Sequence, residues 1–420
     1  MSTRSLSEWL RWQESLNPAE IDLGLDRVCA IADRLALAPP AGHVFVVAGT
    51  NGKGTCCAFL SELLRSQGLR VGLYSSPHLI RYNERIQIGG ENIDDAALVA
   101  AFEEIESVRG DIPLTYFEFG TLAALLCFSR AQCEAWVLEI GLGGRLDAVN
   151  IAAADYSIIT TVDFDHQDWL GDTIEAIAAE KAGIIKSAVP AFYGDQPVPN
   201  AVVTRAAEAG APLIALGQQY SYSDDGDTWS WRGLEFELQG LAFPPGRGAE
   251  QLRNISLVLA VIEQYSSELL ASVAVREIIG SLQLPGRFQI IRRDVEWVLD
   301  VAHNVQAARA LSAKLLINKE GFTATTIVIG MLADKQVASF VGAMVDVADS
   351  WVACPTTGQR GSDSSELATC IERVASAPVA IAETVEQGLE LARDITPAGG
   401  RIIVCGSFLI VGPALEWLGL

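Results

Sequence analysis

The segment that points most directly to chemistry is a glycine-rich stretch directly after an apolar run. Val44 to Val47 are apolar, and Ala48 leads into Gly49-Thr50-Asn51-Gly52-Lys53-Gly54-Thr55. Glycines let backbone N–H groups close around an anion, a following helix adds its N-terminal dipole, and a lysine supplies a mobile cation for outer phosphates. We therefore predict a buried strand, a phosphate-binding loop and a helix start, with Thr55 placed to hold a magnesium ion.

This loop departs from the common G-x-x-x-x-G-K-[ST] pattern. Val47 stands five positions before Gly52, and Gly54 separates Lys53 from Thr55. The alternative interpretation is a plain glycine-rich turn between a strand and a helix. The strand, loop and helix context with a well-placed lysine favours nucleotide binding by roughly ten to one.

Two further polar positions follow predicted strands. Glu139 stands at the end of the strand predicted at 135–140, directly after apolar residues. A carboxylate there is costly to bury unless it meets a cation, and Mg²⁺ prefers such oxygen ligands. A hydroxyl-rich loop, Ser75-Ser76-Pro77-His78, follows the strand predicted at 70–75. Ligands of open α/β sheets lie at this end of parallel strands, although a turn capped by serine is about equally plausible here.

Composition limits the classes of protein that remain. The 52 acidic and 30 basic residues give a net charge of −22, whereas nucleic-acid binding needs clustered Lys and Arg. The eight cysteines include no C-x-x-C pair and lie mostly in apolar runs, as in reduced cytosolic proteins. The N-terminus lacks the apolar region of a signal peptide, and glycines, Pro413 and Glu416 interrupt the apolar stretch 402–420. We expect a cytoplasmic protein without nucleic-acid or membrane partners.

The positioning elements predict an α/β protein of two domains, since 420 residues are long for one core. Apolar periodicity predicts helices over 5–16, 56–67, 96–107, 114–130, 173–185, 252–265 and 275–282, strands over 135–140 and 156–162, and a β-hairpin region over 219–243. The turn residues at 284–288 break the pattern, so we place a first domain at 1–284, a linker at 285–288 and a second domain at 289–420. Strands near 295–299, 326–330, 350–353, 378–382 and 401–405 predict a small parallel sheet in the second.

Six short motifs, in this order, resemble the folate branch of the Mur ligase superfamily. They are I-D-L-G-L-D-R-V at 21–28, G-T-N-G-K-G-T at 49–55, S-S-P-H-L at 75–79, T-Y-F-E at 115–118, E-K-A-G-I at 180–184 and D-V-A-H-N at 300–304. The resemblance extends from Ile21 to Gly406-Ser407-Phe408, which makes it far more specific than any single motif. It implies a P-loop, Mur-ligase-like ATP-binding domain followed by a smaller Rossmann-like α/β domain.

The resemblance also implies roles for individual residues. ATP would contact Thr50, Asn51, Gly52, Lys53, Gly54, Thr55, Asn254, Arg287 and Asp300. Mg²⁺ would be held by Ser76, Glu139 and His166, with a carbamate on Lys181 serving a second ion. The pterin would contact Asp22, Leu23, Gly24, Thr115, Phe117, Glu118, Asp147 and Ala148. Lys53, Lys181, His166 and His303 would be the catalytic groups.

Several of these residues have plain structural alternatives. Asp22 is also suited to cap a helix, and the aromatic start of the helix at 114–130 is also typical of a packed core. A single histidine such as His166 is by default a surface residue, and a helical lysine such as Lys181 usually faces solvent. Of the four histidines, however, His78, His166 and His303 all fall at ends of predicted strands within the motifs above.

The chemistry that the resemblance implies is ATP-dependent amide formation. A carboxylate would receive the γ-phosphoryl group of ATP, and the amine of L-glutamate would displace phosphate from the acyl phosphate. The implied substrates are 7,8-dihydropteroate, reduced folates, L-glutamate and ATP, with Mg²⁺. The family is typically monomeric, and closure of the two domains on binding is expected.

Two other functions compete with this one. A Mur ligase of cell-wall synthesis would act on a UDP-sugar, but Gly54 and the motifs at 75–78 and 115–118 speak against it. A nucleotide-dependent switch of the GTPase type should carry an N-K-x-D motif, which the sequence lacks. An ATP-driven switch would need no site for a carboxylate substrate.

Four positions depart from the family pattern. Val149 stands where relatives often have Thr, Val305 and Gln306 follow the His-Asn pair where Pro is usual, and Leu409 stands where His is often found. None of these departures removes a predicted phosphate or metal group.

Overall fold

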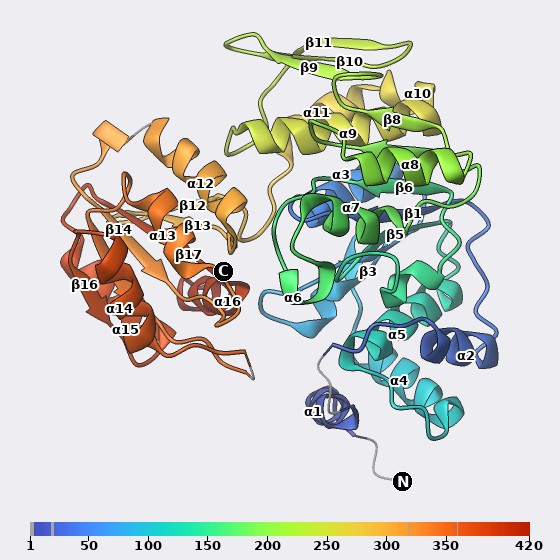
Figure 1. Cartoon of the computed structure of the whole chain (residues 1–420), viewed down its shortest axis with the longest axis horizontal. Helices are drawn as coiled ribbons and strands as arrows, with labels where there is room; N and C mark the ends of the chain where they lie inside the picture. Colours follow the sequence, from blue (N-terminus) through green and yellow to red (C-terminus); the bar gives the residue numbers. More distant parts are fainter. Residues whose placement is uncertain (1–3, 18–20, 318, 359) are drawn as a thin grey trace. The chain divides into compact units, whose positions relative to one another are not determined.

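The computed structural model describes residues 4–17, 21–317, 319–358 and 360–420, in two compact units (Figure 1). Unit 1 comprises Met1–His78, Tyr82–Phe243 and Gln251–Gly280, and unit 2 comprises Leu79–Arg81, Pro244–Glu250 and Ser281–Leu420. The sequence analysis placed the start of the second domain at 289, whereas the main segment of unit 2 starts at Ser281. Unit 2 also includes two short segments, Leu79–Arg81 and Pro244–Glu250, that the sequence did not indicate. Apolar packing explains one of them, because Leu79 and Ile80 pack against the buried cluster around Ile410 and Val411.

An eight-stranded sheet forms the centre of unit 1. Its strands are β1 (Val44–Ala48), β2 (Val71–Tyr74), β3 (Ile86–Ile88), β4 (Glu91–Asn92), β5 (Ala135–Glu139), β6 (Tyr156–Ile159), β7 (Ala191–Tyr193) and β8 (Leu213–Ala215). They are arranged in the order β4-β3-β2-β5-β1-β6-β7-β8, with antiparallel pairing confined to β3 and β4. The central strands are apolar throughout because both faces of a parallel sheet are covered. The ends of β1, β2, β5 and β6 therefore share one edge.

The helices of unit 1 follow the predicted periodicity closely. They are α1 (Leu6–Leu16), α2 (Asp26–Arg34), α3 (Lys53–Ser66), η1 (Tyr82–Arg85), α4 (Asp95–Arg109), α5 (Tyr116–Arg130), η2 (Ala148–Ile151), α6 (Gln167–Leu170), α7 (Ile174–Ala182), α8 (Asn200–Glu208), α9 (Ala249–Tyr265), α10 (Ser267–Leu270) and α11 (Val273–Ser281). A capping box between Ser5 and Glu8 starts α1. The aromatic face of α1 packs on α4 and α5, where the Trp9 ring contacts Phe102 and Phe119.

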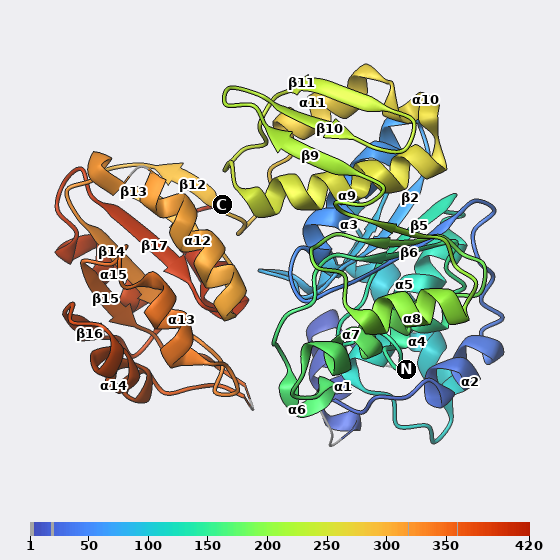
Figure 2. The same cartoon turned by 45° about the horizontal axis from the view of Figure 1, so that its top comes forward.

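The predicted hairpin region at 219–243 forms a separate antiparallel sheet. Its strands are β9 (Ser221–Asp224), β10 (Trp229–Arg232) and β11 (Glu237–Leu241), in the order β11-β10-β9. Trp229 and Trp231, two residues apart, are both fully buried, as expected for one face of a strand. Trp231 Nε1 donates to Ser256 O of α9 over 3.1 Å, which fixes the sheet on that helix (Figure 2).

Unit 2 contains a six-stranded sheet covered on both faces. Its strands are β12 (Gln289–Arg292), β13 (Glu296–Leu299), β14 (Thr325–Ile329), β15 (Ser350–Ala353), β16 (Val379–Ile381) and β17 (Arg401–Cys405), in the order β12-β13-β17-β14-β15-β16. The helices are α12 (Val305–Ile317), η3 (Lys319–Gly321), α13 (Val337–Met344), α14 (Ser364–Val374), α15 (Val385–Ile395) and α16 (Phe408–Trp417). The five predicted strands are confirmed. The unpredicted β12 is an antiparallel edge strand.

Gly72 of β2 provides a test of packing in unit 1. A Cβ at this position would lie 2.5 Å from a ring carbon of Phe128, which is fully buried. We expect Gly72→Ala to lower the free energy of unfolding by about 1–3 kcal/mol, because the ring must move within a filled core. Denaturant unfolding measures this change.

Gly280→Ala is the matched control. This glycine is exposed in α11, and its nearest neighbour for an added Cβ is Ala242 at 3.8 Å. Alanine should raise the unfolding free energy by about 1 kcal/mol through helix propensity. Equal effects of the two substitutions would contradict the packing of Gly72 against Phe128.

Candidate active site

Hydrogen bonds hold the phosphate loop against the segment that follows β6. The Thr50 N–H donates to Thr161 O over 2.8 Å, and the Asn51 N–H donates to Thr161 Oγ1 over 3.0 Å. Thr160 Oγ1 donates to Asn51 O over 2.6 Å. The Thr50 hydroxyl donates to Asp163 O and accepts from the Asp163 N–H. The loop between β1 and α3 is therefore fixed along its length.

Two glycines of this loop are required by close approach. A Cβ on Gly49 would lie 1.8 Å from Thr160 Oγ1, and one on Gly52 would lie 2.4 Å from Asn254 Oδ1. Gly52 has a φ of 86°, a left-handed conformation that favours glycine, immediately before the first residue of α3. Asn254, the predicted adenine-side residue, is thus a buried neighbour of the loop.

Lys53 folds back over the loop from the first turn of α3. Its Nζ donates to Gly49 O over 2.9 Å and to Thr50 O over 3.3 Å. The ammonium group and the N-terminus of α3, where Gly54 and Thr55 lie, therefore belong to one concave backbone segment. Such a segment is suited to bind phosphate groups.

The structure brings two of the predicted metal ligands together. Glu139, the last residue of β5, is buried, and its Oε2 accepts the Ser76 N–H over 3.0 Å. His166 is the N-cap residue before α6, with a φ of 50°, and its Nε2 lies 3.9 Å from Asp165 Oδ1. In the described ranges, no three His, Cys, Asp or Glu side chains form a group that could hold a metal. The carboxylate and hydroxyl oxygens suit Mg²⁺, which in nucleotide sites takes further oxygens from phosphates and water.

Lys181 of α7 is a buried cation of unusual acidity. Burial lowers its pKa from 10.5 to about 7; nearby Lys53 acts in the same direction, while Asp165 and Asp147 oppose it. A large fraction of this amine is therefore neutral near pH 7. Close packing of α7 on the loop 141–147, which follows β5, places it there, since a Cβ on Gly144 would lie 2.9 Å from Glu180 O.

Asp147 has a structural function that the sequence analysis did not predict. Its Oδ2 accepts the Leu142 N–H over 2.8 Å and its Oδ1 accepts the Val149 N–H over 3.0 Å, so it organises the loop before η2. Burial raises the pKa of this carboxyl from 3.8 to about 6, although the backbone hydrogen bonds oppose the shift. Neighbouring Ala148 is also buried.

The predicted pterin residues near the N-terminus are joined by Arg27, which the sequence analysis did not single out. Arg27 pairs with Asp22 Oδ2 at 2.8 Å and with Glu118 Oε1 at 2.9 Å. Thr115 and Glu118 form the capping box of α5, a structural role that the sequence analysis did not predict. Leu23 and Gly24 lie in the partly exposed segment between Asp22 and Arg27.

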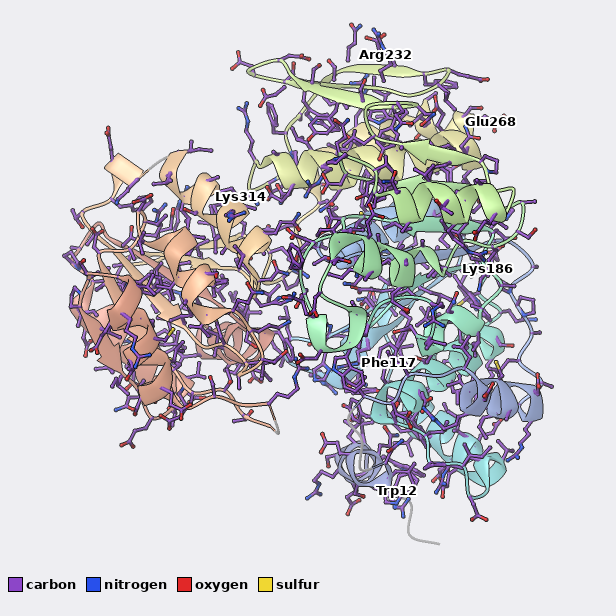
Figure 3. All side chains as sticks on the ribbon, in the orientation of Figure 1. Trp12, Phe117, Lys186, Arg232, Glu268 and Lys314 are labelled. Atoms are coloured by element: carbon purple, nitrogen blue, oxygen red, sulfur yellow. The ribbon has the colours of Figure 1, made fainter. Side chains whose placement is uncertain are left out.

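Phe117, labelled in Figure 3, is in the first turn of α5 and lies against the loop 141–147 that follows β5. A Cβ on Gly141 would lie 2.6 Å from Phe117 Cζ. The ring also contacts Tyr74, with 6.0 Å between the centroids. Unit 1 thus places the predicted pterin residue Phe117 against the loop that leads to Asp147 and Ala148.

The predicted nucleotide residues of unit 2 gather around the end of β13. Asp300 Oδ2 accepts the Phe288 N–H over 2.9 Å and its Oδ1 accepts the Ala302 N–H over 2.8 Å. His303 Nδ1 lies 2.9 Å from Val301 O. Asp300 therefore ties the turn that contains Arg287 to β13, and contact of these residues with ATP stays a prediction.

Comparison with known proteins identifies relatives along nearly the whole chain. The model of the Mur ligase middle domain matches residues 47–291, and that of the Mur ligase glutamate ligase domain matches residues 286–408. The dihydrofolate synthase/folylpolyglutamate synthase of Escherichia coli (strain K12) is 40% identical over 412 residues, which cover 98% of this chain and 95% of the relative. The Haemophilus influenzae protein of the same name is 38% identical over 383 residues, covering 87% of this chain and 86% of the relative.

Solved structures agree with this similarity. Escherichia coli FolC in complex with DHPP and ADP has a TM-score of 0.93 and 39% identity, covering 99% of this chain and 98% of that chain. A bifunctional folylpolyglutamate synthase/dihydrofolate synthase with Mn, AMPPNP and L-glutamate bound has a TM-score of 0.90 and 40% identity. The match covers 100% of this chain and 99% of that chain.

The burial of Lys181 predicts a pH dependence of stability. Because the pKa is about 7 in the folded chain and 10.5 ordinarily, the unfolded chain binds more protons between these values. The free energy of unfolding should therefore rise with pH, by at most about 1.4 kcal/mol per unit from this group. Denaturant unfolding in CO₂-free buffer from about pH 7 to about pH 9 should show wild type gaining stability relative to Lys181→Met. A constant difference between the two proteins would contradict a buried amine.

Proposed function

The chain belongs to the Mur ligase family, in its dihydrofolate synthase/folylpolyglutamate synthase branch, and we propose its activity on this premise. It is an ATP-dependent ligase that adds L-glutamate to dihydropteroate, giving dihydrofolate, and to the glutamate tail of reduced folates. The observation that carries this function is the full-length match to a relative solved with DHPP and ADP, combined with a fully built phosphate loop in this chain.

The first step activates a carboxylate, which by itself is a poor electrophile. A carboxylate oxygen of the acid attacks the γ-phosphorus of ATP, the bond to the bridging oxygen breaks, and ADP leaves. The backbone N–H groups of the loop and Lys53 stabilise negative charge on the transferred group. The same proposal includes contacts of the nucleotide with Asn254, Arg287, Asp300 and His303.

Divalent metal binding accords with this site, and Ser76, Glu139 and His166 are the proposed ligands. A bound Mg²⁺ would neutralise charge on the phosphate oxygens. The neutral fraction of Lys181 is the form of an amine that reacts with CO₂, which supports a carbamate at this position. That carbamate would replace a cation by an anion beside Lys53.

The second step forms the amide. The uncharged amine of L-glutamate attacks the acyl carbon, the bond to the phosphate oxygen breaks, and inorganic phosphate leaves with the oxygen that came from the carboxylate. The amine proton passes to solvent or phosphate, so no nucleophilic side chain is needed. Phe117 and Asp147, with the segment Asp22–Gly24, are proposed to hold the pterin near the phosphate loop.

The proposal also covers the partners, the location and the oligomeric state of the enzyme. The partners are small molecules, and we propose a cytoplasmic monomer with no nucleic-acid or membrane partner. Among the described residues, no helix is long and apolar enough to cross a membrane. Gel filtration with light scattering tests the monomer.

Phosphate release tests the activity directly. With ATP, Mg²⁺ and L-glutamate, wild type should release phosphate with both dihydropteroate and a reduced folate. Lys53→Ala should lower kcat about 100-fold or more, because a cation that stabilises the transferred phosphoryl group is lost. Release with the folate alone would reduce the function to polyglutamylation. No release with either acid, despite ATP binding, would refute the ligase assignment for these substrates.

Asp147→Ala tests the pterin site. If Asp147 bonds the pterin ring, the substitution should weaken pteroate binding about 10-fold while ATP affinity is retained. It should also destabilise the protein, since two backbone N–H groups lose their acceptor. Asp155→Ala is the control, because Asp155 Oδ2 accepts the Val44 N–H at the opposite end of β1. Unchanged pteroate affinity in Asp147→Ala would show the pterin role to be wrong.

A further inference from the structure

Arg85, the last residue of η1, is a buried cation without a role in the site as described so far. It is 9% exposed, and its Nε donates to His78 Nδ1 over 2.8 Å. Its guanidinium carbon lies 5.2 Å from the ring centre of Tyr82 and 5.7 Å from that of Tyr116. Within the described ranges it forms no ion pair with a carboxylate.

The histidine beside Arg85 does not balance its charge. His78 Nδ1 accepts the Arg85 Nε–H, but an imidazole ring is either neutral or cationic and supplies no negative charge. The two aromatic rings contribute their faces and no full negative charge. Buried arginines are ordinarily paired with an acid, so this cation lacks its usual partner.

A second polar group at this place also lacks a partner. The Tyr82 hydroxyl is enclosed and, among the described residues, has no hydrogen-bond partner. A Cβ on Gly120 of α5 would lie 2.4 Å from this oxygen and 3.3 Å from Tyr74 Oη, so the two hydroxyls meet at a glycine. Burying a hydroxyl without a hydrogen-bond partner is unfavourable.

Arg85 contacts chain neighbours of two groups of predicted site residues. Its carbonyl accepts the Ser75 N–H over 3.0 Å, which places it beside the proposed metal ligand Ser76. On the other side, Tyr116 stands between Thr115 and Phe117 at the start of α5. Arg85 therefore contacts the segment that leads to Ser76 through its backbone and the first turn of α5 through its side chain.

We propose that Arg85 binds a carboxylate of the acid substrate that does not react, namely the α-carboxylate in the glutamate tail of a reduced folate. An arginine fork matches a carboxylate in shape and charge. The reacting carboxylate is a poor occupant, because pairing with arginine would reduce its nucleophilicity toward ATP. Dihydropteroate has one carboxylate, which must react, so Arg85 distinguishes the two acids. This inference rests on the proposed function.

Arg85→Gln tests the inference by substrate comparison. We expect the KM for tetrahydrofolate monoglutamate to rise about 10- to 100-fold, because a charged hydrogen-bond pair is lost. The KM for dihydropteroate and that for ATP should stay within about twofold. Arg85→Lys should recover part of the folate affinity. Arg70→Gln, which removes the same charge from an exposed position, should change neither KM.

Thermal unfolding separates binding from a structural role. Because Arg85 has no acid partner in the ligand-free protein, Arg85→Gln should leave Tm unchanged or raise it. Arg27→Gln should lower Tm, since it strands the buried carboxylate of Glu118.

Three results would overturn the inference: an unchanged folate KM, equal losses with both acids, or a lowered Tm in Arg85→Gln. Absence of turnover by wild type with either acid would refute the proposed function instead. Direct titration of wild type and Arg85→Gln with tetrahydrofolate monoglutamate would then still decide the role of Arg85, with equal affinities counting against it.

Discussion

The proposed chemistry depends on one constraint, the close approach of the phosphate loop to the chain that follows β6. Gly49 and Gly52 leave no space for a side chain, and the hydroxyls of Thr160 and Thr161 bond the backbone of Asn51. These contacts fix the backbone at the edge where β1, β2, β5 and β6 end. Lys53, Glu139 and the segment around His166 are positioned from this edge, so the site is set by sheet order before any ligand binds.

Ionisable side chains are buried around this loop. Burial lowers the pKa of Lys181, and the nearby charge of Lys53 lowers it further. Asp147 is a buried carboxyl in the same region, and backbone N–H groups hold it in place. The backbone N–H groups of the loop and Lys53 suit nucleotide phosphates, and the proposed role of Arg85 pairs a buried cation with a carboxylate.

The sequence predicted the elements better than it predicted the contacts between them. The strand, loop and helix at 44–66 are encoded locally, by an apolar run followed by glycines and a lysine, and the structure confirms them. Arg27 could not be assigned, because its partner Glu118 is distant in sequence and either residue alone suits a helix start. The double role of Asp147 and the pairing of Arg85 with His78 depend in the same way on burial. The edge strand β12 is exposed on alternate residues and carries little apolar signal.

Tracing the oxygen that activation transfers is the most direct test of the central claim, that a carboxylate is phosphorylated before glutamate attacks. Dihydropteroate labelled with ¹⁸O in its carboxylate would be converted with ATP and L-glutamate, and the released phosphate analysed by mass spectrometry. An acyl phosphate predicts one labelled oxygen in each phosphate formed. Unlabelled phosphate, formed in step with dihydrofolate, would contradict the mechanism.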